Sequence, residues 1–413
     1  MEGPTAEQVI AYPDICVAGG GPAGMMAGLL FARAGLKVTV LEKHRDFLRD
    51  FRGDTVHPST LELFRELGLL GGLLERPHDK VERLTAIVAG RTITIADFRR
   101  LSVASHFIAM MPQWEFLDFL AQAARRWPGF DLRMEAEAAG LLEDEAGRVT
   151  GVRLADGRAV RAALTIAADG RRSVLRKAAG LPLIDLGAPM DVFWFRLPKL
   201  PGRGNHTTGV FATGQLLALI DRGDYWQCAY VFPKGRAGDI RAEGLDRFRQ
   251  RVREAAPFLD PDCLNDWDRI SLLSVALDRL ERWHRPGLLA IGDAAHAMSP
   301  VGGVGINLAI QDAVAAANIL ADPMRMGRAI DPLLAQVQAR RMMPTRVIQA
   351  IQKAAHDRII SPLVIERRPL TRPPLLLRML DALPPLRRIP AQVIGLGVRR
   401  EHIESPGVPP IGD

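Results

Sequence analysis

The stretch Asp14-Ile-Cys-Val-Ala-Gly-Gly-Gly-Pro-Ala-Gly24 decides the fold of this chain. Its first residues predict a short buried strand that runs directly into the glycines. The pattern after the glycines indicates a helix that ends at Gly35, with one apolar face made by Ala23, Ala27, Leu30 and Ala34. Residues 37–41 form a second apolar run. Because a strand, a helix and a strand follow one another within about 30 residues, we predict a βαβ unit and a parallel sheet.

The glycines have the spacing Gly19-x-Gly21-x-x-Gly24, and Glu42 follows at the end of the second strand. Gly19 would make a tight turn, Gly21 would let the backbone approach a pyrophosphate, and Gly24 would let helix and strand pack closely. The helix N-terminus attracts phosphate. A carboxylate at Glu42 would accept hydrogen bonds from a ribose and repel a 2′-phosphate. The pattern therefore predicts that this site binds FAD or NAD. The alternative is a glycine-rich turn that binds no ligand.

Two further motifs follow strands. The first is Ala168-Asp169-Gly170-Arg171-Arg172-Ser173, which alone is also typical of a turn. The second is Gly292-Asp293-Ala294-Ala295-His296, followed by Pro300, Gly302, Gly303, Gly305, Ile306 and Asn307. Since the second motif lies between a strand and a helix, the backbone amides of Gly305–Asn307 would lie at a helix N-terminus and could stabilise an anion. His296 is either a base or a structural residue of this motif.

The three motifs in this order resemble the single-component FAD-dependent aromatic hydroxylases, the class A flavoprotein monooxygenases with the p-hydroxybenzoate hydroxylase fold. The resemblance covers residues 12 to about 350. It implies an α/β fold with a Rossmann-like FAD-binding domain, an inserted mixed β-sheet substrate domain and a helical C-terminal region. The activity it implies is hydroxylation or epoxidation of a hydrophobic, aromatic small molecule with NADH or NADPH and O₂, through a C4a-hydroperoxyflavin. The alternatives are a reductase or dehydrogenase on this fold and a flavin-binding protein without turnover.

The resemblance also assigns residues to the cofactor. Glu42 would hold the adenosine ribose, and Asp293 would hold the ribityl or pyrophosphate part. The backbone of Gly305, Ile306 and Asn307 would line and stabilise the flavin, which is the catalytic role it implies here. The full expected FAD set is Gly19, Gly21, Ala23, Gly24, Glu42, Lys43, Arg52, Gln113, Asp169, Gly292, Asp293, Pro300, Gly303, Gly305, Ile306 and Asn307.

No second Gly-x-Gly-x-x-Gly occurs in a βαβ context. The nicotinamide cofactor would thus bind transiently in a surface cleft, where Arg171 and Arg172 could meet its phosphates or could form an exposed basic turn. Aromatic residues gather in the strands predicted between 181 and 285. With period two, Trp226, Tyr230 and Phe232 share one strand face, which we assign to the substrate, with ordinary sheet packing as the alternative. We expect no metal.

The positions of these motifs suggest how the chain is divided into domains. We expect the FAD-binding domain to comprise residues 1–85, 111–180 and 286–330. Residues 86–110 would supply strands to the substrate domain, whose main part is residues 181–285. Residues 331–413 would form a helical C-terminal region and tail. Within these parts, the sequence predicts a hairpin at Asp156-Gly157 with strands at 148–154 and 158–166, and one strand over 210–220.

Composition excludes several classes of protein. A length of 413 residues suggests two or three domains, and 48% hydrophobic residues exclude collagen-like and wholly disordered chains. Cys16, Cys228 and Cys263 are too few and too widely spaced for a disulfide scaffold or a zinc ribbon, which favours a cytoplasmic location. The first fifteen residues do not have the pattern of a secretory signal, and no run of about 18 uncharged apolar residues predicts a membrane-spanning helix.

The net charge of +7 belongs to the C-terminal part of the chain. Residues 321–413 hold 15 Lys+Arg and 8 Asp+Glu, and the rest of the chain is balanced. The arginines occur in scattered pairs without interleaved aromatics, so we expect no nucleic-acid partner. A basic amphipathic tail can lie on an anionic membrane surface or pack on its own protein, and the sequence leaves both open. It also leaves open the substrate, the choice of NADH or NADPH, and the oligomeric state.

Overall fold

The computed structural model describes residues 8–48, 55–199 and 207–410. At its centre is a six-stranded sheet in the order β21-β22-β13-β2-β3-β9. Its strands are β2 (Ile15–Ala18), β3 (Val38–Leu41), β9 (Phe130–Arg133), β13 (Leu164–Ala167), β21 (His284–Arg285) and β22 (Leu288–Ala290). All neighbours pair in parallel except β21 with β22. The predicted parallel sheet is confirmed, and it joins segments far apart in the sequence.

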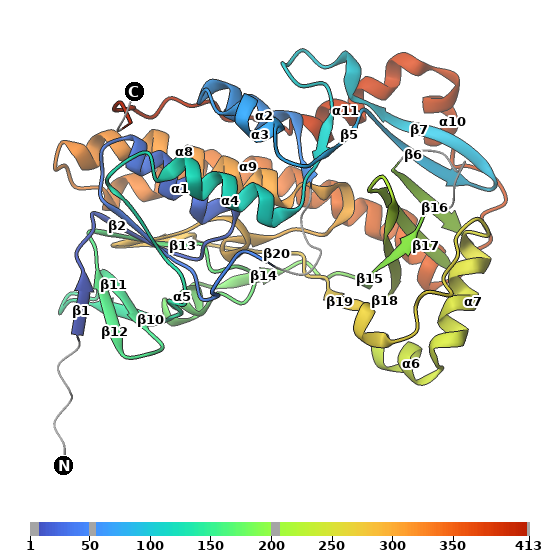
Figure 1. The fold of residues 1–413 in the computed structure, drawn as a ribbon, viewed down its shortest axis with the longest axis horizontal. Coiled ribbons are helices and arrows are strands. Elements are labelled where there is room, and N and C mark those ends of the chain that lie inside the picture. Colours follow the sequence, from blue (N-terminus) through green and yellow to red (C-terminus); the bar gives the residue numbers. More distant parts are fainter. Residues whose placement is uncertain (1–7, 49–54, 200–206, 411–413) are drawn as a thin grey trace.

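The central sheet is covered on both faces (Figure 1). Helices α1 (Pro22–Arg33), α4 (Gln113–Ala124) and α8 (Gly305–Arg325) pack on one face, where Ile15 and Val17 point. Cys16 and Ala18 point to the other face, which packs on the four-stranded sheet of β1 (Gln8–Ala11), β10 (Ala138–Glu143), β11 (Val149–Leu154) and β12 (Arg158–Arg161). A strand buried on both faces reads as the continuous apolar run seen at 14–18.

A seven-stranded sheet forms the other half of the molecule, on the right of Figure 1, in the order β19-β15-β18-β17-β16-β6-β7. Its strands are β6 (Arg83–Val88), β7 (Arg91–Asp97), β15 (Met190–Pro198), β16 (Thr208–Ala212), β17 (Gln215–Asp221), β18 (Tyr225–Pro233) and β19 (Ser271–Ser274). Helices α6 (Ala237–Ala242) and α7 (Leu245–Ala255) follow β18. One face of the sheet packs on α7 through Phe248 and Val252.

Smaller elements connect the two halves. They are α2 (Pro58–Glu66), α3 (Leu70–Leu74), α5 (Val174–Ala178), the three-stranded sheet of β4 (Thr55–Val56), β8 (Ile108–Met110) and β5 (Asp79–Val81), and the sheet of β14 (Leu183–Asp185), β20 (Asp278–Leu280) and β23 (His296–Ala297). The predicted boundary at residue 86 falls inside β6. β8 pairs with β4 and β5 rather than with the seven-stranded sheet.

Two predicted strands are wrong in extent. The run 210–220 is two antiparallel strands, β16 and β17, because the chain reverses at Thr213-Gly214, where Gly214 has φ +76°. The run 158–166 also divides. Its first part, β12, pairs with β11 in the predicted hairpin, whereas β13 belongs to the central sheet. The sequence carried a signal at both breaks, since Thr213-Gly214-Gln215 interrupts the first run and Arg161 interrupts the second.

The C-terminal part is helical and returns to the first half of the molecule. It comprises α9 (Asp331–Ala355), the π-helical turn η5 (His356–Ile365), α10 (Leu375–Ala382) and α11 (Arg388–Gly395). Residues 399–408 then run back over α1 and α8, where Val408 donates its N–H to Arg33 O. Among the described residues, one helix, 301–325, is apolar and long enough to cross a bilayer, and 78% of its apolar window is buried inside the protein.

Candidate functional site

The turn between β2 and α1 requires its glycines at two positions. A Cβ at Gly24 would lie 1.9 Å from Gly19 O, so only glycine lets the helix approach the strand. Gly19 has φ +109°, and a Cβ there would lie 2.3 Å from Ala168 O. A Cβ at Gly21 meets nothing within 4 Å. The space at Gly21 and the N-terminus of α1, which no side chain caps, form an open and electropositive place for a phosphate group.

Glu42 lies beside this turn at the end of β3. Its Oε2 accepts the N–H of Gly20 at 3.0 Å, and its Oε1 accepts the N–H of His44 at 3.0 Å and lies 2.7 Å from His44 Nδ1. The side chain is 9% exposed. The carboxylate is thus held in place by protein donors beside the glycine turn, as a ribose-binding carboxylate would have to be.

The Gly292-Asp293 turn packs between two helices. A Cβ at Gly292, where φ is +59°, would lie 3.0 Å from Ala23 Cβ and 3.1 Å from Ala309 Cβ. The first turns of α1 and α8 and the Gly-Asp turn therefore converge. Sequences about 270 residues apart meet here because the parallel strands β2, β13 and β22 all end at the same edge of the sheet.

The buried carboxylate of Asp312 holds the Gly292-Asp293 turn in place. Asp312 of α8 is fully buried, and its Oδ2 accepts the Gly292 N–H at 3.1 Å and lies 2.6 Å from His296 Nε2. Its Oδ1 accepts Nε of Arg341 at 3.0 Å. Burial alone would raise the pKa of Asp312, but His296 and Arg341 outweigh it and lower the pKa. His296 is 1% exposed, so the structural interpretation of this histidine fits its surroundings.

The loop Pro300–Gly305 precedes α8 and is fixed by residues 55–60. Thr55 Oγ1 donates to Gly303 O at 2.7 Å. Oδ1 of Asn307 accepts the N–H of His57 at 2.9 Å and the hydroxyl of Thr60 at 2.7 Å, and its Nδ2 donates to Thr55 O and Gly303 O. Among the described residues, no side-chain hydrogen bond caps the N-terminus of α8. The backbone amides of Gly305, Ile306 and Asn307 therefore lie in the first turn of an uncapped helix, the geometry expected for anion stabilisation.

Asp169 and the arginines after it have protein partners. Asp169 accepts the N–H of Val174 at 2.8 Å and of Leu175 at 3.2 Å, and so caps α5. Arg171 Nε lies 3.1 Å from Asp293 Oδ2, which joins the second and third motifs. Arg172 is exposed. Of the two arginines expected to meet NAD(P)H, Arg172 is therefore open to solvent, whereas Arg171 is paired with an expected FAD residue.

The other expected cofactor residues are placed as follows. Lys43 is exposed directly after β3, and Gln113 is half-buried at the start of α4. Pro300 precedes the turn that holds Gly303, and Ile306 packs partly on the main core. Arg52 lies outside the described residues. Within the described part of the chain, no group of three His, Cys, Asp or Glu could hold a metal ion.

The aromatic residues assigned to the substrate lie on the covered face of the seven-stranded sheet. Tyr230 and Phe232 pack with Phe193 and with Phe248 of α7, and Trp226 belongs to the same buried cluster. The opposite face packs on η5 through Ile360, Leu363 and Val364 and contacts Val301 of the glycine-rich loop. Its residues are Val192, Trp194, Leu216, Ala218, Ala229, Val231 and Leu273. Period two correctly predicted which residues share a face, but the face it selected packs against α7.

Three further residues near these turns were not assigned a site role from the sequence. Thr55 and Asp312 hold the glycine-rich loop and the Gly-Asp turn. Trp194 lies on the sheet face toward Val301, and its buried Nε1 has no hydrogen-bond partner among the described residues. A buried indole N–H normally finds an acceptor. An aromatic residue on the face of β15 opposite to Phe193 was a usable signal for Trp194. Thr55 and Asp312 are revealed only by their contacts in the structure.

Comparison with known proteins now adds to this geometry. The model of the FAD binding domain family matches residues 12–351, most of the chain. This protein belongs to the class A FAD-dependent aromatic hydroxylases. The chain is 36% identical over 352 residues to 6-methylpretetramide 4-monooxygenase of Streptomyces rimosus, which covers 83% of both proteins. It is 32% identical to rifampicin monooxygenase of Streptomyces venezuelae, covering 73% of this chain and 62% of that one.

Solved structures agree with the hydroxylase fold. p-Nitrophenol 4-monooxygenase of Pseudomonas putida superposes with a TM-score of 0.75 at 18% identity, covering 94% of this chain and all of the other. Anhydrotetracycline hydroxylase of S. rimosus superposes with a TM-score of 0.73 at 24% identity, covering 94% of this chain and 77% of that chain. The predicted fold of a Rossmann-like FAD domain with an inserted sheet is thereby confirmed. The chain is a flavin-dependent monooxygenase of this family.

The residues present fit FAD. The open space at Gly21 would admit a pyrophosphate, and the uncapped helix α1 would donate its N–H groups to it. The buried Glu42 carboxylate lies beside the glycine turn and is oriented by the Gly20 N–H and by His44. These donors suit an anionic dinucleotide with a free ribose hydroxyl.

Proposed function

We propose that this protein uses NADH or NADPH and O₂ to hydroxylate a fused-ring aromatic compound of polyketide type. The observation that carries the proposal is the 36% identity, over most of both chains, to an enzyme named for 6-methylpretetramide. The predicted site residues retain the chemistry that such an enzyme needs. The overall reaction would consume one NAD(P)H, one O₂ and one proton, insert one oxygen atom into a C–H bond, and release NAD(P)⁺ and water.

FAD would be held by three segments. The N-terminal turn of α1 would bind the pyrophosphate, and Glu42 would accept hydrogen bonds from the ribose. Asp293 would contact the ribityl chain while Arg171 keeps its carboxylate oriented. The amides of Gly305–Asn307, fixed through Asn307 and Thr60, would stabilise negative charge at the pyrimidine edge of the ring.

FAD, reduced by the nicotinamide cofactor, would supply the activation of O₂. The chain itself must position the substrate and keep water out. The sheet face that contacts Val301 and η5 would supply apolar contacts for this task. Trp194 would contribute its indole N–H, which has no partner among the described residues, to a carbonyl or phenolic oxygen of the substrate. Arg172, exposed beside Asp169, would meet the phosphates of NAD(P)H.

Oxygen incorporation tests the proposal. The FAD-loaded protein is given NADH or NADPH, ¹⁸O₂ and 6-methylpretetramide or a related fused-ring aromatic, and the product is analysed by mass spectrometry. We expect one labelled oxygen in the product and flavin reduction at least ~10-fold faster with substrate than without, a change of about 1.4 kcal/mol in the barrier. Oxidised product without label would favour the reductase or dehydrogenase. Absence of NAD(P)H oxidation with every aromatic tried would favour a flavin-binding protein without turnover.

A further inference from the structure

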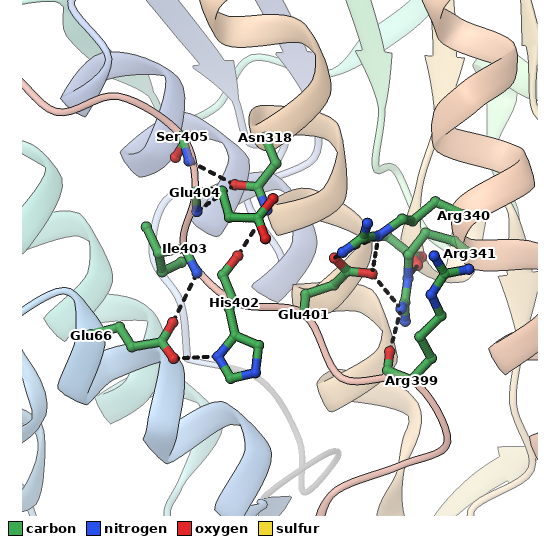
Figure 2. A network of polar contacts seen from close by, with 11 residues as sticks. Glu66, Asn318, Arg340, Arg341, Arg399, Glu401, His402, Ile403, Glu404 and Ser405 are labelled. Atoms are coloured by element: carbon green, nitrogen blue, oxygen red, sulfur yellow. Dashed lines mark hydrogen bonds and ion pairs between the residues drawn. The ribbon is translucent and has the colours of Figure 1, made fainter.

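The carboxylate that holds the Gly-Asp turn is itself held by the C-terminal segment. Arg341 of α9 is fully buried and donates Nε to Asp312, and its Nη1 donates to Glu401 Oε1 and to Arg399 O, both at 3.2 Å. Glu401 is fully buried at its side chain and also pairs with Arg340 at 2.8 Å. Figure 2 shows Glu401 between the two arginines of α9. A continuous buried chain of polar contacts therefore runs from Glu401 to Gly292.

A second contact links the C-terminal segment to the residues that support the glycine-rich loop. Nδ1 of His57 lies 2.6 Å from the carbonyl oxygen of Ile394, at the end of α11. The same histidine donates its backbone N–H to Asn307, whose side chain fixes the start of α8. The segment 394–401 thus touches residues that support both the Gly-Asp turn and the glycine-rich loop. The two contacts are made by different residues and use different atoms.

We infer that the C-terminal segment 394–401 is a positioning element of the FAD site, acting through Arg341 and Asp312 on the Gly292-Asp293 turn. Glu401 places a negative charge against the buried guanidinium of Arg341 and accepts one of its N–H groups, which helps to hold the guanidinium toward Asp312. Without Glu401, Nη1 of Arg341 keeps only Arg399 O as an acceptor and the buried cation loses one of its two carboxylate partners. A shift of the guanidinium would then release the Asp312 carboxylate from the Gly292 N–H. The inference rests on the proposed position of FAD at this turn. Glu401 and Arg341 are positioning residues, since neither would touch the cofactor.

The chain offers a matched control on the same tail. Glu66 of α2 accepts His402 Nδ1 at 2.5 Å and the Ile403 N–H at 2.8 Å, beside Glu401 in sequence. Figure 2 shows that Glu66 contacts the tail from α2, on the side away from the arginines of α9. Removal of Glu66 therefore loosens the tail without touching Arg341. Comparison of the two glutamates separates positioning of FAD from attachment of the tail.

The experiment measures the dissociation constant of FAD. Apoprotein of the full chain is titrated into FAD, whose fluorescence changes on binding, and thermal unfolding of each apoprotein is recorded. We expect Glu401→Ala to raise the dissociation constant on the order of 10-fold, because couplings of this kind amount to about 0.5–2 kcal/mol. Glu401→Gln, which keeps an oxygen acceptor for Arg341, should restore part of the affinity. Glu66→Ala should bind FAD as the unchanged protein does, even with a lower melting temperature.

Each outcome decides the inference. An unchanged dissociation constant in Glu401→Ala overturns it, and so does an equal rise in Glu66→Ala, which would reduce the effect to general loosening of the tail. If Glu401→Ala does not fold, Glu401→Leu takes its place, because it also removes the acceptor for Arg341 but fills the buried space, and an unchanged constant there overturns the inference too. If the unchanged protein itself binds no FAD, the proposed function fails, which is a separate result from loss of the coupling.

Discussion

The hydroxyl of Thr55 and the carbonyl of Gly303 are joined by a 2.7 Å hydrogen bond, and a Cβ at Gly303 would lie 2.7 Å from that same hydroxyl oxygen. The glycine-rich loop and the strand β4 are therefore in contact with no room for a methyl group. Gly303 also has φ +63°, in the left-handed region. Both conditions favour glycine at this position.

Gly303→Ala tests the contact, and Gly302→Ala is its control. Gly302 also has a positive φ, +81°, but a Cβ there meets only Val304 Cγ1 at 3.7 Å. Both variants bear the backbone strain of alanine at positive φ, about 1 kcal/mol or more. Only Gly303→Ala must also displace Thr55, so its melting temperature and FAD affinity should fall further. Equal losses in the two variants would show that the contact with Thr55 contributes nothing.

Glu42→Ala should weaken FAD binding. A charge-assisted hydrogen bond to a ribose hydroxyl contributes roughly 1.5–3 kcal/mol, so the dissociation constant should rise by about one to two decades. His44→Ala removes one partner of the carboxylate and leaves Glu42 in place, so its effect should be much smaller. Isothermal titration of apoprotein with FAD gives both constants. Equal affinity in Glu42→Ala and the unchanged protein would remove Glu42 from the ribose site.

Trp194→Phe should weaken substrate binding and leave FAD occupancy unchanged. The variant keeps an aromatic ring on the sheet face toward Val301 and loses one N–H donor, worth about 0.5–1.5 kcal/mol, so KM should rise about 2- to 12-fold. Tyr230→Phe changes the opposite face, which packs on α7, and should leave KM as it is. Steady-state kinetics with a turned-over aromatic substrate compares them. A larger rise of KM in Tyr230→Phe than in Trp194→Phe would indicate that the substrate binds on the side of the sheet that faces α7.

Stability should fall with acid in a window set by His57. Burial lowers the pKa of His57 to about 4, although the carbonyl of Ile394 partly offsets it. The unfolded chain binds this proton below about pH 6.5, and the folded chain only below about pH 4. Between these values the unfolded state binds more protons, so the free energy of unfolding decreases as the pH falls, by about 3 kcal/mol in all for this residue.

His57→Gln removes that titration. Urea unfolding at a series of pH values should therefore show a shallower decline for the variant between pH 6.5 and 4. Some decline should persist, because burial also lowers the pKa of His284 and His356. Parallel curves for the variant and the unchanged protein would mean that His57 does not contribute to acid sensitivity.

The cofactor half of this protein was predictable because its constraints are local. Gly24 must be glycine to avoid Gly19 O, five positions earlier, and the α1–β3 order follows from a pattern within thirty residues. The substrate half was not. Which side of β18 is covered by α7 depends on where that helix packs, and Phe248, Val252 and Ala255 on one face of α7 were the available signal. Arg341 and Glu401 lie 60 positions apart, and no spacing rule connects them.

The position of Glu401 in the sequence also delays the formation of its ion pair with Arg341 during synthesis of the chain. Domains generally fold as units while the chain emerges at about 5–20 residues per second. Glu401 follows Arg341 by 60 residues, so about 3–12 s pass between their synthesis. During that interval the guanidinium that belongs in the interior lacks one of its two acidic partners, and the central sheet has already received β22. Arg341 therefore gains its second acidic partner only after the strands of the central sheet have been synthesised.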